Sequence, residues 1–264
     1  MAWQRITVGG IEADVDLTAP TDLSLPVSDG GTTAWEISPA TISPLQIGEF
    51  IGSVQAGGSV NFNNVQFNPH AHGTHTESCG HVLREIRPLT LNPPPALQFA
   101  QLLTINEGAL DANGGIPAHF FEGKTLAPEI TAIILRLVSP ELMLMTAPEN
   151  LDAPANWSGS NPPYLTPAAM QALVVHGIEH LLINLPSVDP EEDGGALMAH
   201  RIFWGIGEDR EPGPDFRPEA TISELLAIPE SLEDGIYLLN LQLGPMINDA
   251  CPSRPIVFPA KVLR

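Results

Sequence analysis

The sequence has few cysteines and no long hydrophobic run. Only Cys79 and Cys251 carry a thiol among 264 residues, which excludes a disulfide framework and favours a reducing compartment. No stretch of 18 or more apolar residues occurs, so a membrane-spanning helix is not expected. The first residues lack the basic end and apolar run of a secretory signal. We therefore expect a cytoplasmic protein.

Basic residues are also scarce. The chain has 11 Lys and Arg against 31 Asp and Glu, which gives a formal net charge of −20. A surface of this sign repels phosphate backbones and anionic lipid headgroups, so neither nucleic acid nor a membrane is an expected partner. The hydrophobic content of 43% is too high for intrinsic disorder. The 27 prolines and 23 glycines indicate many turns and long loops.

The pattern of apolar residues predicts one mixed α/β domain over residues 1–264, with more strand than helix. No internal repeat or linker divides it, and the polar stretch 148–163 is interpreted as a long surface loop. Helices are expected from the N-cap Thr166 to Gly177 and over residues 195–204. Strands are expected at residues 11–17, 23–27, 59–67, 98–105, 131–138, 180–185, 236–243 and 256–263.

Several catalytic motifs are missing. The chain has no G-x-S-x-G, the motif of many serine hydrolases. It has no G-x-G-x-x-G and no phosphate-binding loop, so nothing points to nucleotide chemistry. A cysteine nucleophile paired with a histidine stays open at Cys79.

Histidines are clustered. Four of the eight, His70, His72, His75 and His81, lie within twelve consecutive positions. Imidazoles and carboxylates are the usual ligands of zinc and similar ions. His75 and Glu77 are two residues apart and would project from one face of an extended strand, where they could bind one ion. His81 lies further on, where it could act as a general acid or base without binding the ion.

This segment resembles the signature of the cyclase family, which includes bacterial kynurenine formamidases and isatin hydrolases. That signature reads H-x-G-T-H-x-D-x-P-x-H. The positions that match are Gly73, Thr74, His75, Glu77 (an acid where the family has Asp) and His81.

Two further positions depart from the signature. Cys79 replaces the proline, and Ala71 stands where the family has its first histidine, with His70 and His72 on either side. A shift of one residue in the strand, such as a bulge, could bring His70 into the ligand position. We favour His70 because its side chain has room to approach across Gly73, and His72 stays open as the alternative.

The resemblance continues through the second half of the chain, to about Val262. His200 matches a later family histidine on a helix, and Glu224 matches an acid that opens a segment leading into a strand. Asp189 resembles a strand-end aspartate that fixes a loop without binding metal. His119, His176 and His180 are interpreted as structural.

The resemblance implies a fold, a cofactor and a reaction. The fold is a swivelling β/β/α domain, assembled as a homodimer or homotetramer. One or two divalent ions would be bound, with Zn²⁺ as the first candidate and Mn²⁺ as the second. A carboxylate such as Glu77 could bridge two ions, and His81 would protonate the departing nitrogen. The loops 93–95 and 150–163 would border the pocket. The implied metal ligands are His70, His75, Glu77, His200 and Glu224.

The leading reaction is arylformamidase-like hydrolysis of a small amide, a reaction type used in tryptophan catabolism. Opening of a cyclic amide or lactone, as in isatin hydrolases, and ring closure by dehydration remain alternatives, because the same activated water and the same acid serve each of them. A non-catalytic metal-binding protein on this fold is the second alternative.

Overall fold

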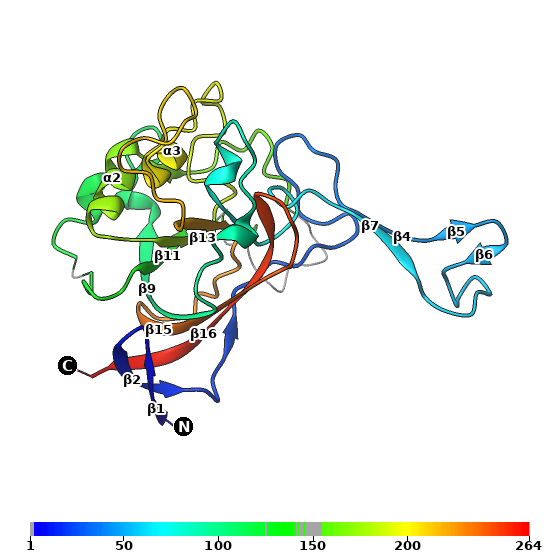
Figure 1. Ribbon diagram of the computed structural model, residues 1–264, viewed down its shortest axis with the longest axis horizontal. Helices are drawn as coiled ribbons and strands as arrows, with labels where there is room; N and C mark the ends of the chain where they lie inside the picture. Colours follow the sequence, from blue (N-terminus) through cyan, green and yellow to red (C-terminus); the bar gives the residue numbers. More distant parts are fainter. Residues whose placement is uncertain (1–2, 125, 141, 143–144, 146–154, 264) are drawn as a thin grey trace.

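A ten-stranded mixed sheet forms the body of the protein (Figure 1). The computed structural model describes residues 3–124, 126–140, 142, 145 and 155–263. The strands of the sheet are β1 (Trp3–Val8), β2 (Ile11–Asp16), β3 (Thr21–Asp22), β8 (His75–Glu77), β9 (Leu97–Asn106), β11 (Ala132–Val138), β13 (His180–Ile183), β14 (Thr221–Glu224), β15 (Gly235–Leu243) and β16 (Ala250–Val262).

Shorter elements surround this sheet. The paired strands outside it are β4 (Thr41–Pro44) with β7 (Asn63–Gln66), β5 (Gln46–Ile47) with β6 (Phe50–Ile51), and β10 (Gly115–Ile116) with β12 (Tyr164–Leu165). The helices with described bounds are α2 (Pro167–Val175), α3 (Met198–Trp204) and the 3-10 turns η1 (Cys79–His81), η2 (Leu89–Leu91), η3 (Glu107–Ala109) and η4 (Ala118–Phe120). None of the described helices is long and apolar enough to cross a bilayer.

The sheet closes on itself through β8. The strand order runs β16-β15-β9-β11-β13-β14-β8, and β8 pairs again with β16. The strands β9, β11, β13 and β14 are parallel, and β15, β16 and β8 run antiparallel to their neighbours. The result is a strand-rich, barrel-like ring with few helices, which is the predicted fold class.

The central strands are buried on both faces, as their continuous apolar run predicts. In β11, Ile133 and Leu135 pack with the core side chains of α2 and α3. The alternating residues Ala132 and Ile134 pack on the opposite face with residues of β9, β15 and β16. The helices thus cover one face of the sheet, and the closed ring encloses the other.

Local signals placed most of the elements correctly. Thr166 caps α2 by accepting a hydrogen bond from the backbone N–H of Ala169 at 3.2 Å, and the left-handed Gly205 ends α3. The strand predicted at residues 23–27 is wrong. Pro26 has no N–H to donate to a ladder, and the Leu25 N–H bonds to the Oγ1 of Thr74 instead.

The loop predicted over residues 148–163 is only partly described. Residues 148–154 lie outside the described part of the chain. Of the rest, Asn156 forms a bridge with Thr33 and the ring of Trp157 is buried in the core. This part is therefore packed against the body and is not a plain surface loop.

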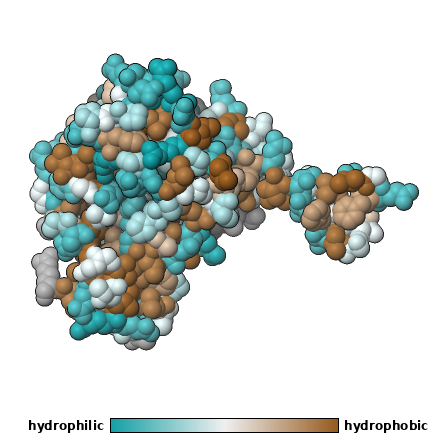
Figure 2. Space-filling view, in the orientation of Figure 1, coloured by the Kyte–Doolittle hydropathy of each residue, from teal (hydrophilic) through white to brown (hydrophobic). Residues whose placement is uncertain are grey.

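An arm extends from the body over residues 41–67 (Figure 1). It is built of the two ribbons β4–β7 and β5–β6 and carries a single charged residue, Glu49. Apolar side chains are exposed on it (Figure 2), including Ile47 at 65% and Phe62 at 56%. The strand predicted at 59–67 exists as the shorter β7, but all its residues are exposed.

Candidate metal centre

Strands and a helix bring four of the predicted site residues together. β8 carries His75 and Glu77, both buried, on one face because alternate residues of a strand project the same way. Glu224 lies directly opposite His75 on the antiparallel β14. His200 comes from the first turn of α3. The expectation that Glu224 precedes a strand is wrong, since it is the last residue of β14.

The other two residues come from turns on either side of β8. His81 ends η1, which follows β8. His70 lies before β8, in a turn closed by the hydrogen bond from the Ala71 N–H to the Asn68 carbonyl at 3.2 Å. The predicted bulge in a strand is therefore wrong, because a turn, rather than an extra strand residue, carries His70 to the cluster.

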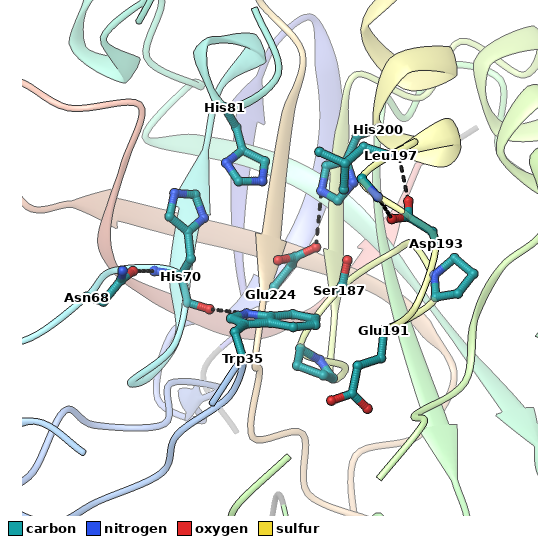
Figure 3. Close-up of a pocket in the computed structure, with 13 residues that line it drawn as sticks. Trp35, Asn68, His70, His81, Ser187, Glu191, Asp193, Leu197, His200 and Glu224 are labelled. Carbon is teal, nitrogen blue, oxygen red and sulfur yellow. Dashed lines mark hydrogen bonds and ion pairs between the residues drawn. The ribbon is translucent and has the colours of Figure 1, made fainter. Parts of the chain in front are cut away.

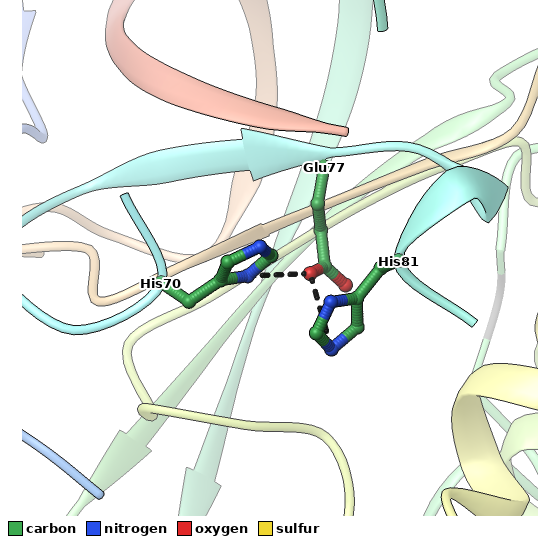
Figure 4. Close-up of side chains that lie close together, drawn as sticks. All are labelled: His70, Glu77 and His81. Atoms are coloured by element: carbon green, nitrogen blue, oxygen red, sulfur yellow. Dashed lines mark ion pairs between the residues drawn. The ribbon is translucent and has the colours of Figure 1, made fainter. Parts of the chain in front are cut away.

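Glu77 is the centre of the cluster. Its carboxylate is fully buried, and Oε2 lies 3.1 Å from Nδ1 of His70 and 3.9 Å from Nε2 of His81 (Figure 4). Its other oxygen, Oε1, lies 3.0 Å from Nε2 of His200. Burial raises the pKa of Glu77, but the charges of His81 and His200 outweigh this effect and hold the pKa well below its usual range.

Glu224 is the second carboxylate at the centre. Its Oε2 lies 3.4 Å from Nε2 of His75, and its Oε1 lies 3.6 Å from Nε2 of His200. The backbone N–H of Val188 donates to Oε1 at 3.1 Å and fixes the side chain. Glu224 therefore joins two imidazoles that come from different elements.

Several inward-facing polar atoms of this cluster are buried without a hydrogen bond. They are Nε2 of His75, both oxygens of Glu77 and Nε2 of His200. Some of them are close in space, but none meets hydrogen-bond geometry with a described residue. Buried polar groups are almost always satisfied, because leaving them unpaired is costly. The nitrogen and oxygen donors of this set fit a divalent cation.

Among the described residues, two groups of side chains are close enough to hold an ion. His70, Glu77 and His81 form one, and His75, Glu77 and Glu224 form the other, with ligand atoms within 4.8 Å of one another in each. Glu77 belongs to both groups. A carboxylate in that position can serve one ion or bridge two.

The outer nitrogens of two imidazoles are fixed by acceptors. Nδ1 of His75 lies 3.1 Å from the carbonyl oxygen of Gly73. Nδ1 of His200 lies 2.6 Å from Oδ2 of Asp189. When the outer nitrogen donates its proton in this way, the inner Nε2 is left as a lone pair facing the carboxylates, which is the tautomer that binds metals.

Asp189 supports His200 through three hydrogen bonds. Besides the ring contact, it accepts from the backbone N–H groups of Ala199 at 2.7 Å and His200 at 3.1 Å, at the start of α3. Burial raises the pKa of Asp189, but its bond to His200 outweighs this effect and lowers the pKa overall. Asp189 therefore fixes the start of α3 and the ring of His200 together.

Asp249 is a site residue that the sequence analysis missed. It lies one residue before β16, and its Oδ2 is 2.9 Å from Nε2 of His70 and 3.4 Å from Nδ1 of His81. Burial lowers the pKa of His70, but the hydrogen bond to Asp249 and the neighbouring carboxylate of Glu77 outweigh this and raise the pKa to about 10. A lone acid at a strand start gives no signal in the sequence, so only the pairing of β16 with β8 reveals it.

The remaining histidines lie elsewhere. His72 accepts the Asn68 N–H on Nδ1 at 2.8 Å and contacts the Ser38 carbonyl through Nε2 at 3.0 Å, which ties two loops together. Nδ1 of His180 contacts Oγ1 of Thr221 at 3.0 Å, and burial lowers the pKa of this histidine to about 4. Of the two candidates for the first position, the structure thus brings His70, and not His72, to Glu77.

A nucleophilic role for Cys79 has no support in the geometry. Cys79 is the first residue of η1, and its side chain is fully buried in the core. Burial raises the pKa of the Cys79 thiol, so the reactive thiolate is disfavoured.

A cavity of about 470 Å³ opens onto the cluster (Figure 3). His70, His81, His200 and Glu224 form its floor, and the Trp35 ring, whose N–H donates to the His70 carbonyl at 3.3 Å, forms part of its wall. The other described residues lining it are Asn68, Pro186, Ser187, Pro190, Glu191, Asp193, Gly195 and Leu197. Neither residues 93–95 nor residues 155–163 are among them, so the predicted border of the pocket is wrong where the structure describes it.

Comparison with known proteins gives a family and a fold. The "Putative cyclase" family model matches residues 21–190. No curated protein matches the chain in sequence. A potential metal-dependent hydrolase with cyclase activity has a similar structure, with a TM-score of 0.63 and 12% identity over 91% of this chain and 97% of that one.

Two isatin hydrolases are also similar in structure. One, bound to the product analogue thioisatinate, has a TM-score of 0.59 and 13% identity over 92% of each chain. The other, isatin hydrolase A from Labrenzia aggregata bound to benzyl benzoate, has a TM-score of 0.58 and 12% identity over 91% of this chain and 93% of that one. At these identities the likeness concerns the fold.

Proposed function

Since this chain belongs to the cyclase family, whose model matches more than half of its length, we propose that it is a metal-dependent hydrolase of a small amide. The observation that carries the proposal is the buried set of nitrogen and oxygen atoms around Glu77. These atoms lack hydrogen bonds, and His200, which carries one of them, forms the floor of a cavity together with His70, His81 and Glu224. A purely structural cluster would satisfy its polar atoms internally and would not need a cavity above them.

The proposed ligands are His70, His75, Glu77, His200 and Glu224. Zn²⁺ is the first candidate and Mn²⁺ the second, because imidazole and carboxylate together suit both. Glu77 directs its two oxygens toward different histidines, an arrangement that supports a shared carboxylate between two ions. When bound, a divalent ion lowers the pKa of a coordinated water and polarises a carbonyl group.

His81 is the proposed general acid and base. Its side chain is 28% exposed, whereas those of His75 and His200 are 0% and 2% exposed, so it is the imidazole most open to the cavity. In the reaction, water adds to the amide carbon, the carbon–nitrogen bond breaks, and one proton of the water ends on the departing nitrogen. His81 accepts that proton and passes it on, so it leaves each cycle unchanged.

The cavity favours a small substrate with a flat apolar part. Its volume is within the range of small-molecule sites. Trp35, Pro186 and Leu197 provide an apolar wall, against which an aromatic ring can pack. We therefore place an N-formyl aniline, the substrate type of an arylformamidase, first. A cyclic aryl amide is the second candidate, because isatin hydrolases are among the similar structures.

Three variants and a substrate panel test the proposal. The purified protein is analysed for its metal content, and hydrolysis of N-formyl anilines, isatin and lactones is measured. We expect His81→Ala to keep the metal and to lose turnover by a factor of about 10²–10⁴, and His75→Ala to lose both. His176→Ala is the matched control, because that ring is exposed and its Nδ1 contacts the Ala172 carbonyl of its own helix. Full activity in both site variants would refute the proposal, and metal without turnover on the whole panel would indicate a non-catalytic metal-binding protein.

A further inference from the structure

Asp249 lies where two imidazoles meet. The neighbouring Ala250 pairs with Glu77 across β16 and β8, which places the Asp249 side chain at the edge of the cluster. Its Oδ2 contacts His70 at 2.9 Å and His81 at 3.4 Å, and these two rings are stacked with centroids 4.3 Å apart. One carboxylate oxygen thus faces both a proposed metal ligand and the proposed acid.

The backbone of Asp249 is itself fixed. Its carbonyl accepts the backbone N–H of Ser78 at 2.9 Å and the Ser78 hydroxyl at 3.2 Å. Ser78 directly follows β8, so the carboxylate is attached to the same strand that carries Glu77. Because its backbone is fixed, the Asp249 carboxylate can hold the rings of His70 and His81 in one orientation.

His70 needs such support more than the other proposed ligands do. His75 lies on β8, between two hydrogen-bonded strands, and His200 lies on α3 and is oriented by Asp189. His70 lies in a turn. Its main chain is held by Asn68 and Trp35, through the His70 N–H at 2.9 Å and the His70 carbonyl at 3.3 Å. These bonds leave the ring free to rotate about its own torsions unless a side chain fixes it.

The contact with Asp249 also selects which nitrogen of His70 faces inward. When Nε2 donates its proton to Asp249, Nδ1 is left as a lone pair 3.1 Å from Oε2 of Glu77. The same arrangement of acceptor, imidazole and inward lone pair occurs at His200 with Asp189. The two carboxylates therefore support rings that face different oxygens of Glu77.

We propose that Asp249 is a positioning residue that orients two rings at once, directing Nδ1 of His70 toward the metal site and holding His81 above it. This inference rests on the proposed function only in that it calls His70 a metal ligand and His81 the acid. The orientation of both rings can be measured without metal or substrate. The two roles are coupled, because loss of one carboxylate releases both rings.

The test compares Asp249→Ala and Asp249→Asn with wild type. We expect Asp249→Ala to lower the affinity for Zn²⁺ or Mn²⁺, measured by competition with a chelating dye, by about 10–100-fold. Its kcat should fall by more than its KM rises, because a misplaced acid affects the reaction and not the apolar wall. Asp249→Asn keeps one acceptor oxygen of the same reach, so it should restore part of both losses. Crystal structures of metal-free wild type and variants should show the rings of His70 and His81 turned in Asp249→Ala.

Asp16→Asn is the matched control. Asp16 is buried and accepts hydrogen bonds from Thr18, so this variant reports the general cost of replacing a hydrogen-bonded aspartate away from the site. If Asp249→Ala matches Asp16→Asn in metal affinity, ring orientation and kcat, the inference is overturned and the proposed function stays intact. If wild type binds neither ion and hydrolyses no amide of the panel, the proposed function fails. In that case only the metal-free crystal structures test the inference, and it is overturned if the rings of His70 and His81 have the same orientation in Asp249→Ala as in wild type. If Asp249→Ala does not fold, Asp249→Asn is judged by the same measurements.

Discussion

Removal of metal should destabilise the protein, and the size of the effect should depend on pH. An ion that binds only the folded state, at a free concentration 100 times its Kd, stabilises that state by about 2.7 kcal/mol. For a chain of this size, each kcal/mol corresponds to about 2–4 °C in Tm, so chelation should lower Tm by about 5–10 °C. Four of the proposed ligands lie on β8, β14 and α3, and His70 lies in the turn before β8, so an ion held there would connect elements that are separate in sequence.

The sign of the pH dependence follows from His70. Its pKa of about 10 in the metal-free fold exceeds the ordinary 6.5. This proton therefore stabilises the metal-free protein fully below pH 6.5, and the stabilisation is lost as pH rises toward 10. An ion must displace the same proton, so metal competes better as pH rises. The pKa values of Asp249 and Glu77 are lowered, so their contribution is lost only in acid and does not change between pH 6 and 8.5.

Calorimetric unfolding with and without a chelator at pH 6, 7.5 and 8.5 measures this effect. The Tm difference between the two conditions should increase with pH in wild type. It should be absent at every pH in His75→Ala, which lacks a fully buried proposed ligand. A Tm that chelation does not change, or a difference that shrinks as pH rises, would show that the cluster around Glu77 is a protonated network and not a metal site.

Three further predictions concern residues near the site. Asp189→Asn should weaken metal binding by about 10–100-fold in a chelator competition, because the ring of His200 loses its charged acceptor; unchanged affinity would mean that α3 alone orients the ring. Gly80→Ala should lower the free energy of unfolding in urea by about 1–3 kcal/mol, since its Cβ would stand 2.3 Å from the backbone oxygen of Arg87; wild-type stability would show that η1 can shift freely. Cys79→Ala should retain hydrolysis of the panel substrates, because the thiol is buried and its pKa is raised by that burial; loss of turnover with metal still bound would restore the thiol as a candidate nucleophile.

Local patterns in the sequence were enough for the strands and helices that build the core. The apolar run ending at Val138 and the cap at Thr166 each act over a few residues, so their outcome depends little on the rest of the chain. The strand expected at residues 23–27 failed because a distant residue, Thr74, takes the Leu25 N–H. Propensity cannot anticipate a partner that lies far away in sequence.

In the candidate site too, features set by neighbouring residues could be predicted, and features set by distant residues could not. The spacing of His75 and Glu77 was sufficient to place both on one strand face, because that geometry is local. Asp249 could not be found in this way, since its role depends on β16 returning beside β8. The turn that carries His70 was also missed, because the signature suggested a strand where the chain instead folds back at Ala71.

β8 is three residues long, yet it joins β14 to β16 and completes the ring. On its opposite face, the hydroxyl of Thr76 contacts that of Ser223 at 2.7 Å. A slip of β8 by one residue against β14 would turn the Thr76 hydroxyl toward the cluster and the side chains of His75 and Glu77 away from it. Anyone transplanting this chemistry into another scaffold would have to carry over the paired segments in their present alignment, and not the individual side chains alone.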